Sequence, residues 1–475
     1  MSAQELSSTK RWLALVAVGI FVFMSTLDST IVNIALPTIA TSLKVSMSVA
    51  TWSVAIYLIA LSGMLLFFGR LGDLIGKVKV FRIGTIIFTV GSLLAGINLG
   101  IGFLLTARVV QALGSAMTMS NSFGIATELF PPQMRARAMA AIGIFVSLGS
   151  ITGPGLGGLI LQFSQWNNIF WVNVPVGILA IILGAVLLPR EEKVKLDKKK
   201  LDWMGTILFF LTIALFFLAV ELGQTIGFTS IPILAAMAVS IVLFVFFIRQ
   251  ERKCNAPMIQ LGIFRNRLFS ISLLASTLTF ATYYFALIIL PFYLQDLLKI
   301  STGQAGLVLM AYPLVMMVVG PFGGYLGDKY NKEIVSCIGI VLVVVTQFGF
   351  LRVSNTSSVW FVVVCLAING AGNALFQSPN NALVMGSVEP KYLGVAGSIN
   401  ALARNIGMII GITLATTTLF LTMSLKYGQN VTDYIPNRPD IFLAGMHVAF
   451  IISGVIGIIA LVVVGSRLVG RYRRS

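Results

Sequence analysis

Residues 69–77 read GRLGDLIGK, and residues 324–332 read GYLGDKYNK. Both stretches have the form Gly-x-Leu-Gly-Asp, three further residues and Lys, and both follow a long apolar segment. Glycines allow a tight turn between closely packed helix ends, the aspartate can accept hydrogen bonds from a helix N-terminus, and the lysine suits the lipid headgroup region. A second echo pairs the loops around Pro132 and Pro390. The chain therefore contains an internal repeat, which predicts two related halves.

Outward from these loops, the chain is almost continuously apolar. Of its 475 residues, 57% are hydrophobic and 10% are charged, which is more apolar surface than a soluble domain can bury. Each apolar run can cross about 30 Å of hydrocarbon as a helix, and the alternating strands of a barrel do not recur. The predicted spans are 12–36, 49–69, 80–98, 102–124, 137–160, 168–188, 203–222, 230–248, 269–294, 304–326, 334–351, 359–380, 393–423 and 444–465. We expect an all-α polytopic membrane protein with 14 transmembrane helices.

The positions of the two loops predict the order of the domains. They close the second and the tenth span, which are eight spans apart instead of the six that two six-helix halves would give. Two extra helices are therefore expected between the halves. The predicted domains are a six-helix bundle over 12–188, two inserted helices with basic flanks over 189–268, and a second six-helix bundle over 269–466. Parallel halves of this kind hold substrate near the bilayer midplane.

The net charge of +17 is explained by the position of the basic residues. With the N-terminus in the cytoplasm, about 26 of the 33 Lys and Arg fall on the inner side, as at 198–200 and 467–474. Cytoplasmic loops of membrane proteins carry such an excess. We therefore expect both termini in the cytoplasm, with the lipid bilayer and not nucleic acid as the partner of the basic loops. A monomer is the expected oligomeric state.

Six stretches together carry a resemblance to a known family. They are LDSTIVNIALP at 27–37, GRLGDLIGKVK at 69–79, RVVQALG at 108–114, GSITGPGLGG at 149–158, FWVNVPVG at 170–177 and LDWMG at 201–205. The chain is similar to the major facilitator superfamily and, with fourteen spans, resembles its proton-coupled drug-exporter branch; Ala112 replaces the usual glycine of the fourth-helix motif. The resemblance covers essentially the whole chain. It implies the major facilitator fold, a bacterial inner membrane location and export by antiport.

Two opposite charges lie inside predicted spans of the first half. Asp28 is roughly 12 Å in from the outer end of the first span, and Arg108 lies at a comparable depth in the fourth. Charges at that depth must face a cavity or a partner, and such a carboxylate can be tuned to bind and release protons. We predict that Asp28 is the proton-binding site and Arg108 its switchable partner, with a purely structural role as the alternative. The equivalent region of the second half, 283–285, has no acid.

Glycines and charges at the inner helix ends predict a cytoplasmic latch that stabilises one facing state. Asp73 and Glu128 are expected near Arg135 and Arg137 as a charge relay. The full predicted set is Gly69, Gly72, Asp73, Gly76, Lys77, Glu128, Arg135, Arg137, Gly327 and Asp328. A cytoplasmic turn without a gating role is the alternative.

The fifth span carries small residues at every fourth position. Gly149, Gly153 and Gly157 share one helix face, with Pro154 and Gly158 beside them. Small residues allow close helix packing, so we expect this face between the two halves. The same stretch matches the antiporter motif of the branch that the chain resembles. It also fits the pattern G-x-G-x-x-G, but no strand precedes it, so a dinucleotide site is excluded.

Polar and aromatic residues inside the spans are expected to line a substrate cavity. Amides facing lipid would be unsatisfied, and aromatic faces suit lipophilic or cationic ligands. The predicted set is Asn33, Tyr57, Gln111, Tyr283, Tyr284, Asn373, Gln377, Asn380 and Arg404. Core packing is the alternative for any single aromatic residue, and pairing with Glu389 is the alternative for Arg404.

The remaining motifs limit the class of function. The phosphate-binding pattern G-x-x-x-x-G-K-[ST] does not occur, and one histidine is too few for a metal or hydrolase site. We expect no enzyme, no metal and no cofactor, with a proton gradient as the energy source. The prediction is a proton-coupled antiporter that exports small lipophilic or cationic compounds, a multidrug efflux transporter. The alternatives are an exporter of a specific metabolite, siderophore or lipid-linked substrate, a sodium-coupled carrier, or a channel.

Overall fold

The computed structural model describes residues 7–131, 134–189, 201–227, 229–254, 257–389 and 393–472. Throughout these ranges the regular secondary structure is helical. Within them, fourteen helical segments are long and apolar enough to cross a membrane. The predicted all-α fold with 14 transmembrane helices is therefore confirmed, and the protein is a multi-pass membrane protein.

The first half of the chain forms six spans. They are α1 (Ser8–Leu43), α2 (Met47–Ile75), α3 (Lys77–Ala95), α4 (Ile101–Leu129), α5 (Arg135–Phe163), and the short α6 (Asn168–Trp171) followed by α7 (Asn173–Leu187). In this group α1 packs on α5 and α7, while α4 packs on α2 and α3. The helices α8 (Trp203–Ile226) and α9 (Ile231–Lys253) follow, and they pack mainly on each other.

The second half also forms six spans, with short helical extensions. They are α10 (Arg267–Phe292) with η5 (Tyr293–Leu297), α11 (Thr302–Leu309) with α12 (Ala311–Lys329), α13 (Lys332–Gly349) with η6 (Phe350–Arg352), α14 (Val359–Gly386), α15 (Leu393–Tyr427) and α16 (Pro439–Tyr472). The turn η4 (Leu261–Arg265) precedes them. Here α14 packs on α12 and α13, and α10 packs on α15 and α16.

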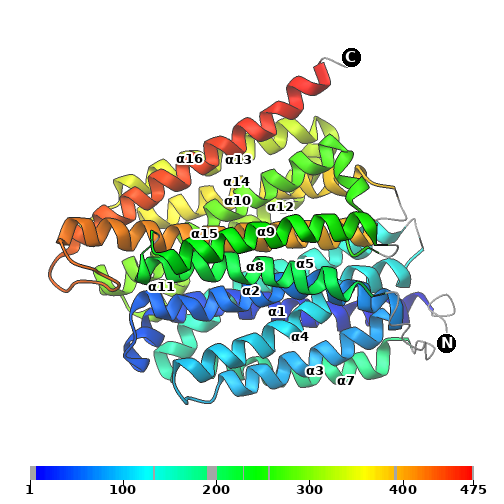
Figure 1. Ribbon diagram of the computed structural model, residues 1–475, viewed down its shortest axis with the longest axis horizontal. Coiled ribbons are helices and arrows are strands. Elements are labelled where there is room, and N and C mark those ends of the chain that lie inside the picture. Colours follow the sequence, from blue (N-terminus) through cyan, green and yellow to red (C-terminus); the bar gives the residue numbers. More distant parts are fainter. Residues whose placement is uncertain are drawn as a thin grey trace.

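The two halves lie against each other, with the inserted helices beside their seam. Figure 1 shows the first half in blue and cyan below the second half, and α8 and α9 in green across the front between them. The contacts agree, because α8 touches both α2 and α15. The start of α1 and the end of α16 lie at the same end of the bundle (Figure 1). We call this end inner, following the orientation that the basic loops predict.

The two copies of the repeated loop turn by different means. Gly76, between α2 and α3, has a φ of 108°, which glycine adopts more readily than other residues. In the second copy, the Asn331 side chain caps α13 by accepting a hydrogen bond from the Glu333 backbone N–H at 2.8 Å. The shared pattern therefore fixes where the chain turns, and the local residue decides how.

Two predicted spans are interrupted, and proline explains both breaks. The span predicted at 168–188 divides after Trp171, and the span predicted at 304–326 divides after Leu309. Pro175 and Pro313 stand four residues later, so neither of these carbonyls receives the usual helical hydrogen bond. Other helices extend past the predicted limits, because backbone hydrogen bonding continues beyond the last apolar side chains.

At the outer end the halves meet where α5 packs on α11. A side-chain carbon on Gly158 would lie 2.9 Å from the Thr302 carbonyl oxygen and 3.2 Å from the Gly306 Cα atom. The two helix backbones are thus in direct contact. Any residue larger than glycine at 158 would force them apart.

The predicted position of the other glycines of α5 needs correction. Gly149, Gly153 and Gly157 face α1 of the same half; a side-chain carbon on Gly149 would lie 2.5 Å from the Phe23 carbonyl oxygen. Residues four apart share a face, but Gly158 is turned about 100° around the helix from Gly157 and so faces the other half. The stripe packs α5 on α1 within the first half, while Gly155 and Gly158, which lie on other faces of α5, meet Met310 and Gly306 of the second half.

Candidate functional site

Asp28 on α1 is the centre of a buried polar network. Its side chain is 0% exposed. Its Oδ2 accepts a hydrogen bond from Arg108 Nη1 at 2.6 Å, and its Oδ1 accepts from Gln111 Nε2 at 2.7 Å and from Asn173 Nδ2 at 2.8 Å. A carboxylate removed from water requires such donors. The charge on α1 is therefore held by one cation and two amides from α4 and α7.

Arg108 keeps partners other than Asp28. It is also 0% exposed. Its Nε donates to the Ser53 carbonyl at 2.9 Å, and its Nη1 also donates to Gln111 Oε1 at 2.5 Å. Its guanidinium carbon lies 4.1 Å from the centre of the Tyr57 ring. Arg108 therefore retains a carbonyl, an amide oxygen and an aromatic face if Asp28 becomes neutral.

Hydroxyl groups extend the network to further helices. Tyr57 Oη lies 3.5 Å from Ser25 Oγ, which lies 2.7 Å from Ser115 Oγ. Gln111 Nε2 donates to Ser92 Oγ at 2.8 Å. With these groups the network joins α1, α2, α3, α4 and α7. These five helices are therefore connected through buried polar contacts.

Among the side chains that bind the Asp28 carboxylate, Asn173 is the one that the sequence analysis did not predict as a site residue. Arg108 and Gln111 are three residues apart on α4 and so share a face, which the sequence makes visible. Asn173 lies at the first residue of α7, immediately after the break behind α6, and is 1% exposed. An amide at the start of an otherwise apolar span was the available signal, because a buried amide requires a partner.

The structure divides the predicted aromatic residues of the cavity between the halves. Tyr57 lies in the Asp28 network. In the second half, Tyr283 of α10 stacks on Tyr312 of α12 with 4.1 Å between ring centres, and it meets Tyr284 edge-on at 5.4 Å. These three tyrosines form an aromatic cluster that joins α10 to α12.

Two predicted amides of α14 bind neighbouring protein groups. Asn373 Nδ2 donates to Asn369 Oδ1 at 3.1 Å, one turn earlier on the same helix. Asn380 Nδ2 donates to the Ser272 carbonyl at 3.2 Å, while its Oδ1 accepts from Arg467 Nη2 at 2.9 Å. Asn380 thereby ties α14 to α10 and α16.

The remaining predicted cavity residues lie at separate positions. Asn33 is buried and donates to the preceding turn of α1, and Gln377 is half-buried on α14. The Arg404 guanidinium carbon lies 5.9 Å from the centre of the Phe280 ring. Its alternative partner Glu389 is exposed, and none of the ion pairs between described residues joins the two.

At the inner end, Lys77 binds both predicted latch acids. Its Nζ lies 3.1 Å from Asp73 Oδ1 and 2.5 Å from Glu128 Oε1. The lysine at the start of α3 thereby links the ends of α2 and α4. The side chains of Arg135 and Arg137 lie outside the described residues, so their part in the latch stays a prediction.

Of the latch glycines, Gly72 and Gly327 are sites of close approach, and Gly69 is in ordinary contact with the other half. A side-chain carbon on Gly72 would overlap the Asn121 amide, and one on Gly69 would lie 3.8 Å from Ser398 Oγ of α15 in the other half. In the second copy, a carbon on Gly327 would lie 3.2 Å from the Pro379 ring. The side chain of Asp328 is outside the described residues.

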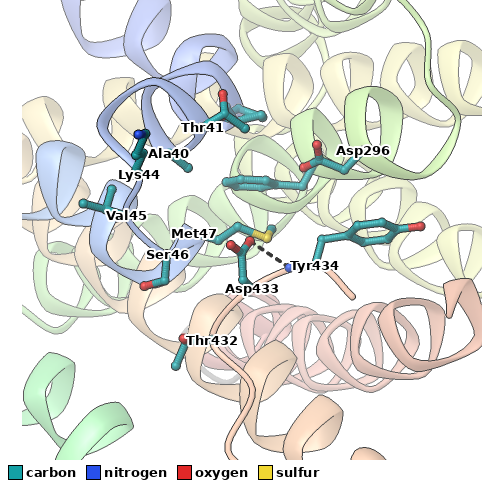
Figure 2. A pocket seen from close by; sticks show the side chains of 12 residues that line it. Ala40, Thr41, Lys44, Val45, Ser46, Met47, Asp296, Thr432, Asp433 and Tyr434 are labelled. Carbon is teal, nitrogen blue, oxygen red and sulfur yellow. Dashed lines mark hydrogen bonds between the residues drawn. The ribbon is translucent and has the colours of Figure 1, made fainter. Parts of the chain in front are cut away.

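A cavity of about 500 Å³ lies at the outer seam of the two halves (Figure 2). Lys44 lines it from the first half, and Asp296 and Asp433 line it from the second. Beside it, the Ser48 backbone N–H donates to the Thr432 carbonyl at 3.4 Å, which joins α2 to the loop before α16. The predicted cavity residues and the Asp28 network are not part of its lining.

Comparison with a family model identifies the chain over nearly its whole length. The model described as Major Facilitator Superfamily matches residues 18–412 and 271–474. The second match begins near the start of α10, the helix that opens the second half.

Several characterised proteins are similar over most of their length. The chain is 33% identical to the riboflavin transporter RibZ of Clostridioides difficile (strain 630), with 88% of this chain and 90% of that protein covered. It is 30% identical to multidrug resistance protein 3 of Bacillus subtilis (strain 168), with 89% and 85% covered. It is 26% identical to the multidrug export protein EmrB of Escherichia coli (strain K12), with 90% and 83% covered.

A solved structure is similar in fold. The crystal structure of the peptide transporter POT in complex with sulfate has a TM-score of 0.67 to this chain at 14% identity, with 95% of this chain and 94% of that chain covered. At this identity the likeness concerns the arrangement of helices alone.

Proposed function

The chain belongs to the Major Facilitator Superfamily, and from this premise we propose that it is an antiporter that exports small lipophilic or cationic compounds in exchange for protons. The proposed location is the bacterial inner membrane, the proposed mechanism is alternating access by a monomer, and the proton gradient is the energy source. The buried ion pair between Asp28 and Arg108 is the observation that carries the proposal.

The proposed coupling step is protonation of Asp28. A neutral Asp28 no longer attracts the guanidinium of Arg108, but Arg108 keeps the Ser53 carbonyl and Gln111 Oε1 as acceptors. The bonds that hold α1 to α4 therefore weaken without leaving the arginine unpaired. Neutralising one charge of a buried ion pair changes its interaction free energy by several kcal/mol. A change of this size is enough to shift an equilibrium between two facing states.

The proposed substrates follow from the relatives and from the second half. Two of the similar proteins are named for multidrug resistance or export. In the aromatic cluster Tyr283 is partly exposed while Tyr284 and Tyr312 are buried, and aromatic ring faces attract cations and stack on flat molecules.

Transport of riboflavin or a comparable flat metabolite is the second candidate function. The relative with 33% identity is named as a riboflavin transporter. The same aromatic cluster would stack on a flat heteroaromatic ring system. The two candidates share a fold and differ in substrate alone.

A proton-flux measurement tests the proposal. Purified protein is reconstituted in vesicles with an internal pH dye, in sodium-free buffer, and ethidium is added. We expect substrate-dependent proton movement in wild type, its loss in Asp28→Asn, and its retention in Asp440→Asn, which removes an exposed carboxylate that pairs with Arg438. Full proton movement in Asp28→Asn would exclude the coupling role of Asp28. Counterflow of labelled riboflavin without response to ethidium would establish the second candidate.

A further inference from the structure

Two buried acids lie together at the inner end of the inserted helices. Asp202, which precedes α8, is 5% exposed, and Glu251, near the end of α9, is 4% exposed. One oxygen of each is satisfied. Asp202 Oδ1 accepts from the Gly205 backbone N–H at 2.8 Å and from Gln250 Nε2 at 3.1 Å, and Glu251 Oε2 accepts from the Ile259 backbone N–H at 2.9 Å.

The other oxygen of each acid is unpaired and faces the same place. Asp202 Oδ2 and Glu251 Oε1 are both buried without a hydrogen-bond partner. A side-chain carbon on Gly205 would overlap the first and lie 3.0 Å from the second. Gly205 therefore leaves room for the two carboxyl groups, which we call the carboxyl pair, to approach each other.

In the part of the chain that the structure describes, no cation pairs with the carboxyl pair. The basic residues that directly follow Glu251 along the chain are Arg252 and Lys253, at the end of α9. Both of these side chains are exposed. Among the described residues, neither acid of the pair forms an ion pair. Two buried carboxylates that face one place without a cation repel each other, and one bound proton removes this repulsion.

A proton fits this arrangement better than a metal ion. Calcium takes six to eight oxygen ligands and magnesium takes six, whereas the pair offers two unused oxygens. The described part of the chain has no group of three or more His, Cys, Asp or Glu that could hold a metal. A proton needs only the two oxygens, because the O–H of one acid donates to the carboxylate of the other.

We propose that Asp202 and Glu251 share one proton, which makes the inner end of the inserted helices a proton-binding site separate from Asp28. The site is connected to the first half through the next residue, Trp203, whose ring lies 5.4 Å from that of Phe67 on α2. Loss of the shared proton leaves two repelling charges, and their separation moves Trp203 against α2. The site thereby conveys the pH of the inner side to the helix that carries the first latch loop.

Infrared titration of the full-length protein in lipid nanodiscs tests this proposal. We expect a protonated carboxyl band at neutral pH in wild type that disappears as the pH is raised. In Asp202→Asn and in Glu251→Gln the band should move at least one pH unit lower, because the new amide donates a hydrogen bond to the remaining carboxylate and removes the like charge. Asp440→Asn is the matched control and should leave the band unchanged.

Asp28→Asn separates this site from the proposed coupling site. This variant keeps both acids of the carboxyl pair, so it should retain the band even if proton-coupled export is lost. Absence of a protonated carboxyl in this variant at neutral pH would overturn the proposal, and that result does not require any variant of the pair to fold. An unchanged band in both pair variants, or displacement of the proton by sodium at constant pH, would also overturn it.

Discussion

The two halves share a loop and a helix plan, but their first helices carry different chemistry. In the first half, α1 presents the Asp28 carboxylate to Arg108 within a fully buried network. In the second half, α10 presents Tyr283, which stacks on Tyr312. Repetition of the architecture therefore does not bring repetition of the site. At these positions the first half has an ion pair and the second half has an aromatic stack, so variants of each should fail in different ways.

Arg108→Leu should have the largest effect on stability. It leaves the Asp28 carboxylate buried without a cation, and breaking a buried ion pair from one side costs about 3–5 kcal/mol. Thermal unfolding in detergent micelles measures the loss. Arg438→Leu is the matched control, because Arg438 pairs with Asp440 at an exposed position and should change the midpoint little. Equal unfolding midpoints for both variants would show that the buried ion pair contributes no more to stability than the exposed one.

Adding Asp28→Leu to Arg108→Leu should restore much of the lost stability. Replacing both charges of a buried pair with apolar groups is often neutral, since no uncompensated charge remains. The double variant should therefore unfold at a higher temperature than Arg108→Leu alone, while proton-coupled export stays absent. A double variant less stable than the single one would mean that Asp28 stabilises the half independently of Arg108.

Asn173→Ala should have the next largest effect on stability. It removes one donor to a charged acceptor, a hydrogen bond worth about 1.5–3 kcal/mol. Asn33→Ala is a suitable control, because Asn33 donates only within its own helix. We expect a lower unfolding midpoint for Asn173→Ala and a change in the pH dependence of export. If both alanine variants behaved alike, Asn173 would not belong to the site.

Tyr283→Leu tests the role of the aromatic cluster in the second half. It removes a stacked aromatic pair worth about 0.5–1.5 kcal/mol beyond area burial. Protons moved per substrate should stay as in wild type, while the affinity for aromatic substrates should fall. Substrate titration of the proton flux measures both quantities. Loss of coupling without loss of affinity would place coupling chemistry in the second half too.

Lys77→Met should have the smallest effect on stability. Its partly exposed ion pairs with Asp73 and Glu128 contribute about 0–1 kcal/mol. The expected result is a shift in the balance of facing states, seen as altered labelling of single cysteines placed at the inner and outer ends. Unaltered labelling at both ends would show that the loop is a turn without a gating role.

The fold was predictable because apolar runs and the repeated loop are local signals. The two breaks were not, since a proline within an apolar run lowers hydropathy little although it removes a backbone donor. In the site, Asp28 and Arg108 could be paired by depth alone. Asn173 could not be paired with Asp28 from the sequence. It lies 145 residues from Asp28 along the chain, and only packing brings the two together. For the glycines of α5, spacing predicted the shared face but not which helix it contacts.

Under the proposed alternating access, the contact of Gly158 with Gly306 would be a pivot for α5 near the outer surface. This helix has 29 residues, so its inner end lies about 35 Å from the contact at ~1.5 Å per residue. A tilt of about 10° about that point carries the inner end sideways through about 6 Å, while the atoms at the pivot hardly move. Under the proposed alternating access, a contact without side chains at one end of the molecule would thus permit a wide opening at the other.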